Sequence, residues 1–231
     1  MQKVLEMDEH RRASASSKNA YAAFKRFFDI IVSLIFIIVL FPVCLVVAVI
    51  AAIDTKSSPI FVQTRMGRYN RPFQMLKFRT MSRTAPANVA TYKLNGADTY
   101  ITKAGRVLRR LSLDEIPQLF NILKGDMSFI GPRPVILAEA ELLDMRKKSG
   151  ADQLRPGITG LAQIRGRNQL DDRAKARYDA FYAHHISLWL DVYIAFHTVG
   201  YVLRSEGIRE GAAAEMKTAC LPTNSSEQER S

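Results

Sequence analysis

Cysteine is scarce in this chain: only Cys44 and Cys220 occur among 231 residues. Cys44 lies inside a long apolar run and Cys220 lies in a polar tail, so the sequence offers neither a framework of disulfide bonds nor a zinc-binding spacing. We therefore expect a reducing environment, with the polar body of the protein facing the cytosol.

Acidic residues are fewer than basic ones: 22 Asp and Glu stand against 33 Lys and Arg, which gives a net charge of +11. This balance suits nucleic acid, anionic lipid and phosphate-rich small substrates equally well. A nucleic-acid module would also carry base-stacking aromatic residues interleaved with its basic residues. Phe73 and Phe78 better suit a core, so we expect no nucleic acid as a partner.

Charged residues are absent from the apolar run at 30–53. As a helix, these 24 residues would extend about 36 Å, enough to cross a hydrocarbon core of about 30 Å. The run is too long for the core of a signal peptide, begins well inside the chain and lacks a cleavage site of small residues. It predicts a membrane segment that stays in the mature protein.

Two features favour a re-entrant membrane helix over a straight span. Pro42 lies at the middle of the run, where it removes a backbone donor and bends a helix. Basic residues flank both ends, whereas a span would place one of these clusters outside, against the positive-inside rule. We expect a helix-break-helix that enters and leaves on the cytoplasmic face of the membrane. The flanking basic residues are Lys18, Lys25, Arg26, Lys56, Arg65, Arg68 and Arg71.

The rest of the chain predicts one helix-rich domain with short strands, of α/β (α+β-like) class. Residues 186–203 are apolar but contain Asp191 and His197, which favours a half-buried amphipathic helix over a second span. A buried Asp191 would need a partner. The other expected elements are strands at 59–63, 73–80 and 161–164, and helices at 106–111, 118–123, 135–148 and 172–184.

Composition also divides the chain into four regions. Both ends are polar and have no apolar face that could pack against a core. The predicted regions are a mobile polar tail at 1–20, the re-entrant membrane helix at 21–55, the main domain at 56–211 and a disordered tail at 212–231.

Asp114 and Glu115 are adjacent carboxylates in front of an apolar helical pattern. Ser112 and Glu115 have the spacing of a capping box, a common arrangement without chemistry. Pro117 weakens that interpretation, because proline prefers the first position of a helix and a helix beginning at Leu113 would place it fifth. A helix that starts at Pro117 leaves both carboxylates outside an end that favours anions, and such a pair suggests a magnesium ion between carboxylates and a pyrophosphate.

Basic side chains bracket this pair and could bind phosphate. Arg133 lies between Pro132 and Pro134, which fix the backbone on both sides and hold its guanidinium in one direction, as bidentate phosphate binding requires. Lys77 and Arg79 alternate along a predicted strand and should point to one face, which could equally be solvent.

Ordered motifs over residues 25–207 resemble the monotopic phosphoglycosyl transferases, which initiate bacterial capsule, exopolysaccharide and O-antigen synthesis. Members often carry Ser before the membrane proline, where this chain has Phe41, so the hydroxyl that could bond to a freed carbonyl is absent. The matching motifs lie at 25–29, 59–67, 77–81, 112–119, 124–128, 131–134 and 155–163, with Ser187 and Asp191 beyond them.

The resemblance implies a sugar-1-phosphate transfer from a UDP-sugar to polyprenyl phosphate, with UMP as the leaving product. Asp114 would be the nucleophile that forms an aspartyl-phosphosugar, and Glu115, with Asp114, would hold Mg²⁺ or Mn²⁺. Domain 56–211 would be catalytic, on the cytoplasmic face of the bacterial inner membrane, and downstream glycosyltransferases would be partners. Family positions that contact phosphates or order the site match Lys77, Arg79, Arg109, Arg133 and Asp191.

Two functions without chemistry compete with this interpretation. One is a membrane scaffold whose basic surface binds anionic lipid, and the other is a membrane-tethered nucleic-acid binder. The adjacent Asp114 and Glu115 disfavour both. The sugar stays open among galactose, glucose and N-acetylated sugars, because hexose discrimination depends on a few pocket contacts without a recognisable code.

Overall fold

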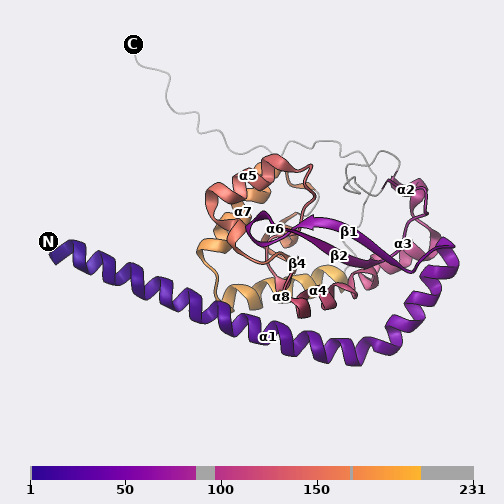
Figure 1. Ribbon diagram of the computed structural model, residues 1–231, viewed down its shortest axis with the longest axis horizontal. Helices are drawn as coiled ribbons and strands as arrows, with labels where there is room; N and C mark the ends of the chain where they lie inside the picture. The colour runs from indigo at the N-terminus through magenta and orange to yellow at the C-terminus, as the bar shows by residue number, and fades with distance from the viewer. Residues whose placement is uncertain (1, 87–96, 167–168, 204–231) are drawn as a thin grey trace, which may run out of the picture.

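The computed structural model describes residues 2–86, 97–166 and 169–203, which fold into a helix-rich body with short strands (Figure 1). The predicted helix-rich domain with short strands is thereby confirmed. Its helices are α1 (Gln2–Thr55), α2 (Ala97–Tyr100), α3 (Lys103–Arg110), α4 (Gln118–Lys124), α5 (Ala140–Ser149), α6 (Leu161–Arg165), α7 (Asp172–His184) and α8 (Leu188–Leu203), with single 3₁₀ turns η1 (Arg68–Asn70), η3 (Leu113–Glu115) and η4 (Ala151–Gln153). Its strands are β1 (Ile60–Met66), β2 (Pro72–Phe78), β3 (Ser128–Ile130) and β4 (Gly157–Thr159).

Helix α1 lies along one side of the body and bends in its C-terminal part before it enters the β1–β2 hairpin (Figure 1). Pro42 lies inside this helix, which continues through it. A bend is what a missing backbone donor and a ring clash produce. The structure therefore has a bent continuous helix where the sequence predicted a helix, a break and a second helix. The return of both ends to one membrane face stays a prediction.

The predicted regional boundaries do not coincide with ends of secondary structure at the N-terminus. Helix α1 begins at Gln2, so residues 2–20, predicted as a mobile tail, are helical and continuous with the apolar segment. The predicted tail at 212–231 lies outside the described residues. The division into four regions stays a prediction.

Most of the apolar surface of α1 is uncovered by the rest of the chain. The stretch Ala20–Thr55 is the one helix among the described residues that is long and apolar enough to cross a membrane, and only 11% of its most apolar window is buried. Phe27, Ile38 and Ile53 are among its exposed side chains. The core helix of a soluble protein would instead be mostly covered, so this exposed apolar surface favours contact with a membrane.

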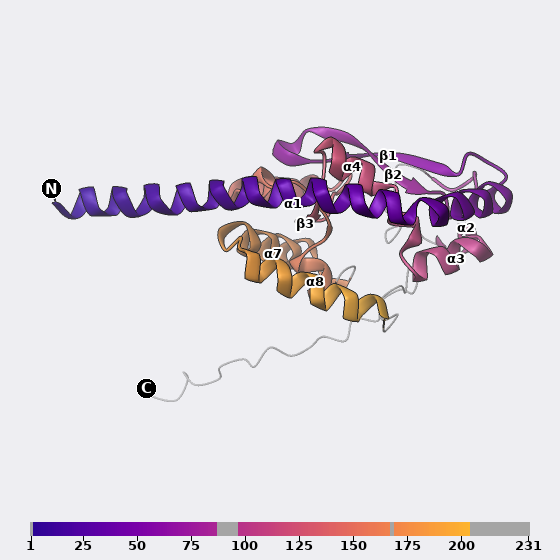
Figure 2. The same ribbon diagram turned by 90° about the horizontal axis from the view of Figure 1, so that it is seen from below.

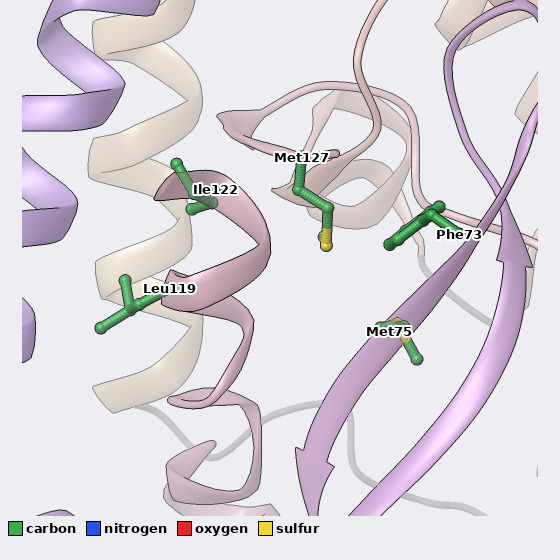
Figure 3. Packing of buried hydrophobic residues seen from close by; sticks show 5 residues of the cluster. All are labelled: Phe73, Met75, Leu119, Ile122 and Met127. Atoms are coloured by element: carbon green, nitrogen blue, oxygen red, sulfur yellow. The ribbon is translucent and has the colours of Figure 1, made fainter. Parts of the chain in front are cut away.

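The β1–β2 hairpin is antiparallel and carries the main core on one face. Phe73 and Met75 of β2 pack against Leu119 and Ile122 of α4, with Met127 from the following loop closing the cluster (Figure 3). Alternation along β2 directs Phe73, Met75 and residue 77 to one face of the strand. The hairpin therefore fixes α4, and the residues just before α4, relative to β2.

The short parallel sheet corrects one prediction. Residues 161–164, predicted as a strand, form helix α6, and the strand lies earlier at β4, where Gly157 and Thr159 pair with β3. The strand forms at β4 because Gly157 can approach β3 closely: a Cβ on Gly157 would lie 2.2 Å from the backbone nitrogen of Gly131. Only a residue without a side chain allows the two segments to approach so closely.

Helix α5 begins five residues later than the helix predicted at 135–148. Val135 and Ile136 are buried in the core, and the carbonyl of Val135 accepts a hydrogen bond of 2.8 Å from the Met66 amide. The Glu139 carboxylate accepts from the Ile136 amide at 3.1 Å. A helix that began at residue 135 would need the Val135 carbonyl for the amide of residue 139, and the bond from Met66 uses that carbonyl instead, so the helix starts only at Ala140.

The two C-terminal helices agree with the sequence. Helix α7 spans the predicted residues, and its N-cap Asp171 accepts from the Ala174 amide at 2.6 Å. Helix α8 is half-buried as predicted, but its exposed face is largely apolar as well: Ile194 is fully buried, whereas Trp189 is 84% exposed. Figure 2 shows α7 and α8 on one side of α1 and the hairpin on the other. The exposed apolar side chains of α8 thus add to those of α1.

Candidate active site

The turn between α3 and α4 carries Asp114 and Glu115. Ser112 adopts left-handed backbone angles, with φ of 55° and ψ of 21°, and reverses the chain after α3. Within the described segment 97–166, its side chain makes no capping hydrogen bond, so the capping-box interpretation is wrong. Leu113–Glu115 form a 3₁₀ turn, and Pro117 stands at the N-cap of α4, which places both carboxylates before that helix as predicted.

Glu115 brings together basic residues that are distant in sequence. Its Oε1 accepts from Lys77 Nζ of β2 at 2.9 Å and from Arg133 Nη2 at 3.4 Å. Asp114, the neighbouring carboxylate, is only 7% exposed. The structure therefore assembles four of the predicted site residues, two acidic and two basic, from three separate parts of the chain.

Apolar packing seats this turn on the membrane helix. Leu113 and Ile116, on either side of the carboxylates, pack into the cluster that Val47 of α1 forms with Phe78 and Leu108. Both side chains are only partly buried, so each stabilises by less than the about 1.5 to 3 kcal/mol of a fully buried one. The turn that carries the carboxylate pair is thus joined to the apolar helix α1 through a shared cluster of apolar side chains.

Arg109 and Arg79 lie near the end of β2 but make other contacts. Arg109 Nε donates to Thr80 Oγ1 at 2.8 Å, which ties α3 to the residue two positions after β2. Arg79 Nε donates to the Ser58 carbonyl at 3.0 Å, and its guanidinium lies 5.5 Å from the centroid of the Phe61 ring. Phe61 faces Lys77 across the hairpin, so Lys77 and Arg79 share a face, as their alternation predicts.

Arg133 is held in place through its backbone. Arg146 of α5 donates from Nη1 to the Arg133 carbonyl at 2.9 Å, and its Nη2 forms a salt bridge of 2.7 Å with Asp179 of α7. Burial raises the pKa of the Asp179 carboxyl, an effect that the nearby Arg146 guanidinium opposes. Sequence reasoning missed both residues, because charges on an amphipathic helix look like a solvated face until the packing of α5 on α7 is known.

Asp191 belongs to a different cluster. Its Oδ2 accepts from Lys25 Nζ at 2.6 Å and Tyr21 Oη at 2.7 Å, and its Oδ1 accepts from Tyr182 Oη at 2.6 Å. Burial and the Asp191 charge raise the pKa of Tyr182, so its hydroxyl keeps the proton that it donates. Asp191 was predicted to need a partner if buried, and its carboxylate accepts hydrogen bonds from three side chains.

The Asp191 cluster and the Glu115 cluster contact α1 at distant points. The first joins α1 at Tyr21 and Lys25, whereas the residues that flank Glu115 pack into the apolar cluster that contains Val47. Twenty-two residues, from 25 to 47, correspond to about 33 Å along the helix at 1.5 Å per residue. The contacts described for Asp191 therefore tie α1 to α7 and α8, and they do not join it to the carboxylate pair.

The donor set suits a magnesium ion better than a fully protein-bound metal. Among the described residues, no group of three or more His, Cys, Asp or Glu side chains could hold a metal. Structural zinc needs four such ligands, whereas Mg²⁺ is commonly held by one or two carboxylates together with substrate phosphates and water. Asp114 and Glu115 provide that minimal set.

Comparison with known proteins places the chain. The family model described as bacterial sugar transferase matches residues 20–205. The chain belongs to this family. The match covers α1 from the start of its apolar stretch, the hairpin and the carboxylate turn, and it confirms the family expected from the motifs.

Relatives of this bacterial sugar transferase differ in length. It is 36% identical to a UDP-N-acetylgalactosamine-undecaprenyl-phosphate N-acetylgalactosaminephosphotransferase of Aeromonas hydrophila, over 90% of this chain but 50% of the relative. It is 37% identical to a UDP-galactose-lipid carrier transferase of Erwinia amylovora, over 83% of this chain and 43% of the relative. It covers 87% of an exopolysaccharide production protein ExoY of Sinorhizobium fredii at 38% identity. The chain thus spans half or less of the first two relatives.

We predict that Asp191 in this sugar transferase stabilises the fold rather than binding substrate. Asp191→Asn leaves Lys25 without its counter-charge in a largely buried position and should lower the free energy of unfolding by about 3 kcal/mol. Tyr182→Phe, which removes one hydroxyl, should cost only about 1 kcal/mol. Thermal unfolding in detergent measures both. Unchanged stability of Asp191→Asn with a raised KM for nucleotide sugar would instead give Asp191 the substrate role implied by the family resemblance.

Proposed function

We propose that this chain transfers a sugar-1-phosphate from a UDP-sugar to undecaprenyl phosphate, giving a polyprenyl-diphosphate-sugar and UMP. The observation that carries the proposal is the buried Asp114 next to Glu115, whose carboxylate lies between Lys77 and Arg133. The residues that flank this pair pack into an apolar cluster that includes Val47 of α1. The names of the Aeromonas and Erwinia relatives support the same class of donor and acceptor.

The arrangement of charges suits a reaction between two phosphate anions. Lys77 and Arg133 are held on Glu115 at 2.9 and 3.4 Å, so they are already placed near the neighbouring carboxylate. An anionic substrate could bind Lys77 and Arg133, and a metal ion could bind Glu115, in place of these ion pairs and without a large movement of the backbone. Preorganised cations of this kind stabilise the charge that develops on a transferred phosphoryl group.

Asp114 acts as nucleophile in this proposal. A carboxylate oxygen of Asp114 bonds to the phosphorus attached to the sugar, and the bond from that phosphorus to the bridging oxygen breaks, so that UMP leaves with the electron pair. An oxygen of undecaprenyl phosphate then bonds to the same phosphorus, and the bond to Asp114 breaks. The second step restores the free carboxylate and divides one difficult displacement into two.

Glu115 and Asp114 would hold the magnesium ion. A divalent cation supplies charge neutralisation at the phosphates when it is bound. Glu115 is suited to this role because its side chain is 14% exposed, open enough to exchange Lys77 or Arg133 for a cation.

The membrane supplies the second substrate. The uncovered apolar side chains of α1 and the exposed Trp189 of α8 favour anchoring at the cytoplasmic face of a bacterial inner membrane, with basic residues at both ends of the apolar segment. Because the carboxylate turn packs into an apolar cluster that includes Val47 of α1, we expect a lipid phosphate at the membrane surface to reach Asp114. Glycosyltransferases that extend the lipid-linked sugar would act downstream.

The transferase activity is tested with a panel of UDP-sugars and undecaprenyl phosphate, with UMP release and lipid-linked sugar as readouts. We predict one preferred sugar and a loss of at least about 1,000-fold in Asp114→Asn, as expected when a nucleophile is removed. A chain that binds anionic vesicles but releases no UMP with any UDP-sugar would support the membrane scaffold instead.

The metal role of Glu115 predicts dependence on a divalent ion. Activity should disappear in EDTA and return with Mg²⁺ or Mn²⁺. Glu115→Gln should lose about 100-fold in turnover, at the upper end of the range for residues that support a metal site. Glu141→Gln, on the exposed first turn of α5, is a matched control and should keep wild-type turnover. Full activity of the wild-type enzyme in the chelator would remove the metal from the mechanism.

The re-entrant topology predicts that both ends of the apolar segment face the cytoplasm. Single cysteines at positions 18 and 56, in a Cys44→Ala, Cys220→Ala background, should be protected from a membrane-impermeant maleimide in intact cells and react after permeabilisation. Pro42→Leu should straighten α1 and favour a span. Labelling of position 18 in intact cells would show that the helix crosses the membrane.

A further inference from the structure

Gln118, the first residue of α4, carries a buried hydrogen-bond donor that the fold does not use. The side chain is 2% exposed. Its Nε2 is one of three buried side-chain atoms, with Ser128 Oγ and Gln163 Oε1, that have no hydrogen-bond partner in the described part of the chain. Leaving a buried donor unsatisfied costs about 1 to 3 kcal/mol, so its retention requires another explanation.

The backbone places Gln118 on the same side of the turn as Asp114. Ile116, at φ −54° and ψ −39°, and Pro117, at φ −60° and ψ −17°, continue the helical path from the 3₁₀ turn into α4. Residues four apart on such a path are neighbours on one side. Asp114 and Gln118 are both buried, and their spacing on this helical path puts the unused amide on the side of the turn that carries the proposed nucleophile.

A second buried amide in the same helix behaves differently. Asn121 Oδ1 accepts from the Leu76 amide at 3.0 Å, and its Nδ2 donates to the Gln74 carbonyl at 2.7 Å. Both ends of the Asn121 amide thus join α4 to β2. Gln118 stands one turn earlier, and its Nε2 makes no such link within the described residues.

We propose that Gln118 Nε2 donates a hydrogen bond to a non-bridging oxygen of the phosphoryl group that is transferred at Asp114. An amide N–H is a neutral donor. It can donate to the phosphoryl group without forming an ion pair with the Asp114 carboxylate. A fixed donor aimed at a group whose charge grows in the transition state lowers the barrier. This inference rests on the proposed function and makes Gln118 a substrate-contacting residue of that reaction.

Gln118→Met tests the inference, because methionine fills a similar volume but cannot donate. Removing an unsatisfied donor should leave the melting temperature unchanged or raise it. Turnover should nevertheless fall about 100-fold, the loss typical of one donor to a developing anion, with KM for the UDP-sugar changed less than about threefold. Asn121→Leu is the matched control: it should lower the melting temperature because it breaks two links between α4 and β2.

The outcomes separate this inference from the proposed function. Wild-type turnover in a stably folded Gln118→Met variant would overturn the role of Gln118 while the transferase activity stands. Failure of the wild-type protein to release UMP would overturn the proposed function, and the role of Gln118 with it. If the methionine variant does not fold, Gln118→Leu also removes the donor in a smaller apolar side chain, and wild-type turnover in that variant would equally overturn the inference.

Discussion

Leu113 and Ile116 pack into the apolar cluster of Val47, Phe78 and Leu108, and this packing of the carboxylate turn beside α1 determines where the chemistry can occur. Asp114 and Glu115 lie between these two anchors, so their position follows the membrane helix rather than the surface of the domain. Carboxylates are strongly hydrated, so moving a pair of them next to an apolar helix costs free energy. The flanking hydrophobic residues hold it there, and Lys77 and Arg133 compensate Glu115.

Polar contacts fix α1 at its other end. Arg26 donates to the carbonyls of Ile122 and Leu123 at 2.6 and 3.0 Å, which satisfies carbonyls at the C-terminal end of α4. Lys25 pairs with Asp191 of α8. Arg26 therefore holds the C-terminal end of α4. The N-terminal end of α4 continues from a turn that packs into the apolar cluster containing Val47. Helix α1 thus fixes the position of α4, the helix that follows the proposed nucleophile.

Sequence reasoning succeeded where a local pattern determines the structure. Helix α7 lies at the predicted residues because Asp171 caps it and its periodicity is regular. The start of α4 follows from Pro117, and the meeting of Glu115 with Arg133 agrees with the charge pattern. Sequence reasoning failed where long-range contacts determine the structure. The close approach of Gly157 to Gly131 puts the strand at β4, upstream of its predicted position. Asp191 accepts hydrogen bonds from Tyr21 and from Lys25, which is 166 residues away in the sequence. The unused donor of Gln118 appears only once burial is known.

The most direct test of this account is the mass of the Asp114 peptide after the protein is mixed with its UDP-sugar and Mg²⁺, without lipid acceptor, and quenched rapidly in acid. We expect a gain of one phosphosugar on that peptide and release of about one equivalent of UMP, both absent in Asp114→Asn. An unmodified Asp114 peptide, from enzyme that transfers sugar phosphate at full rate once lipid is added, would contradict it.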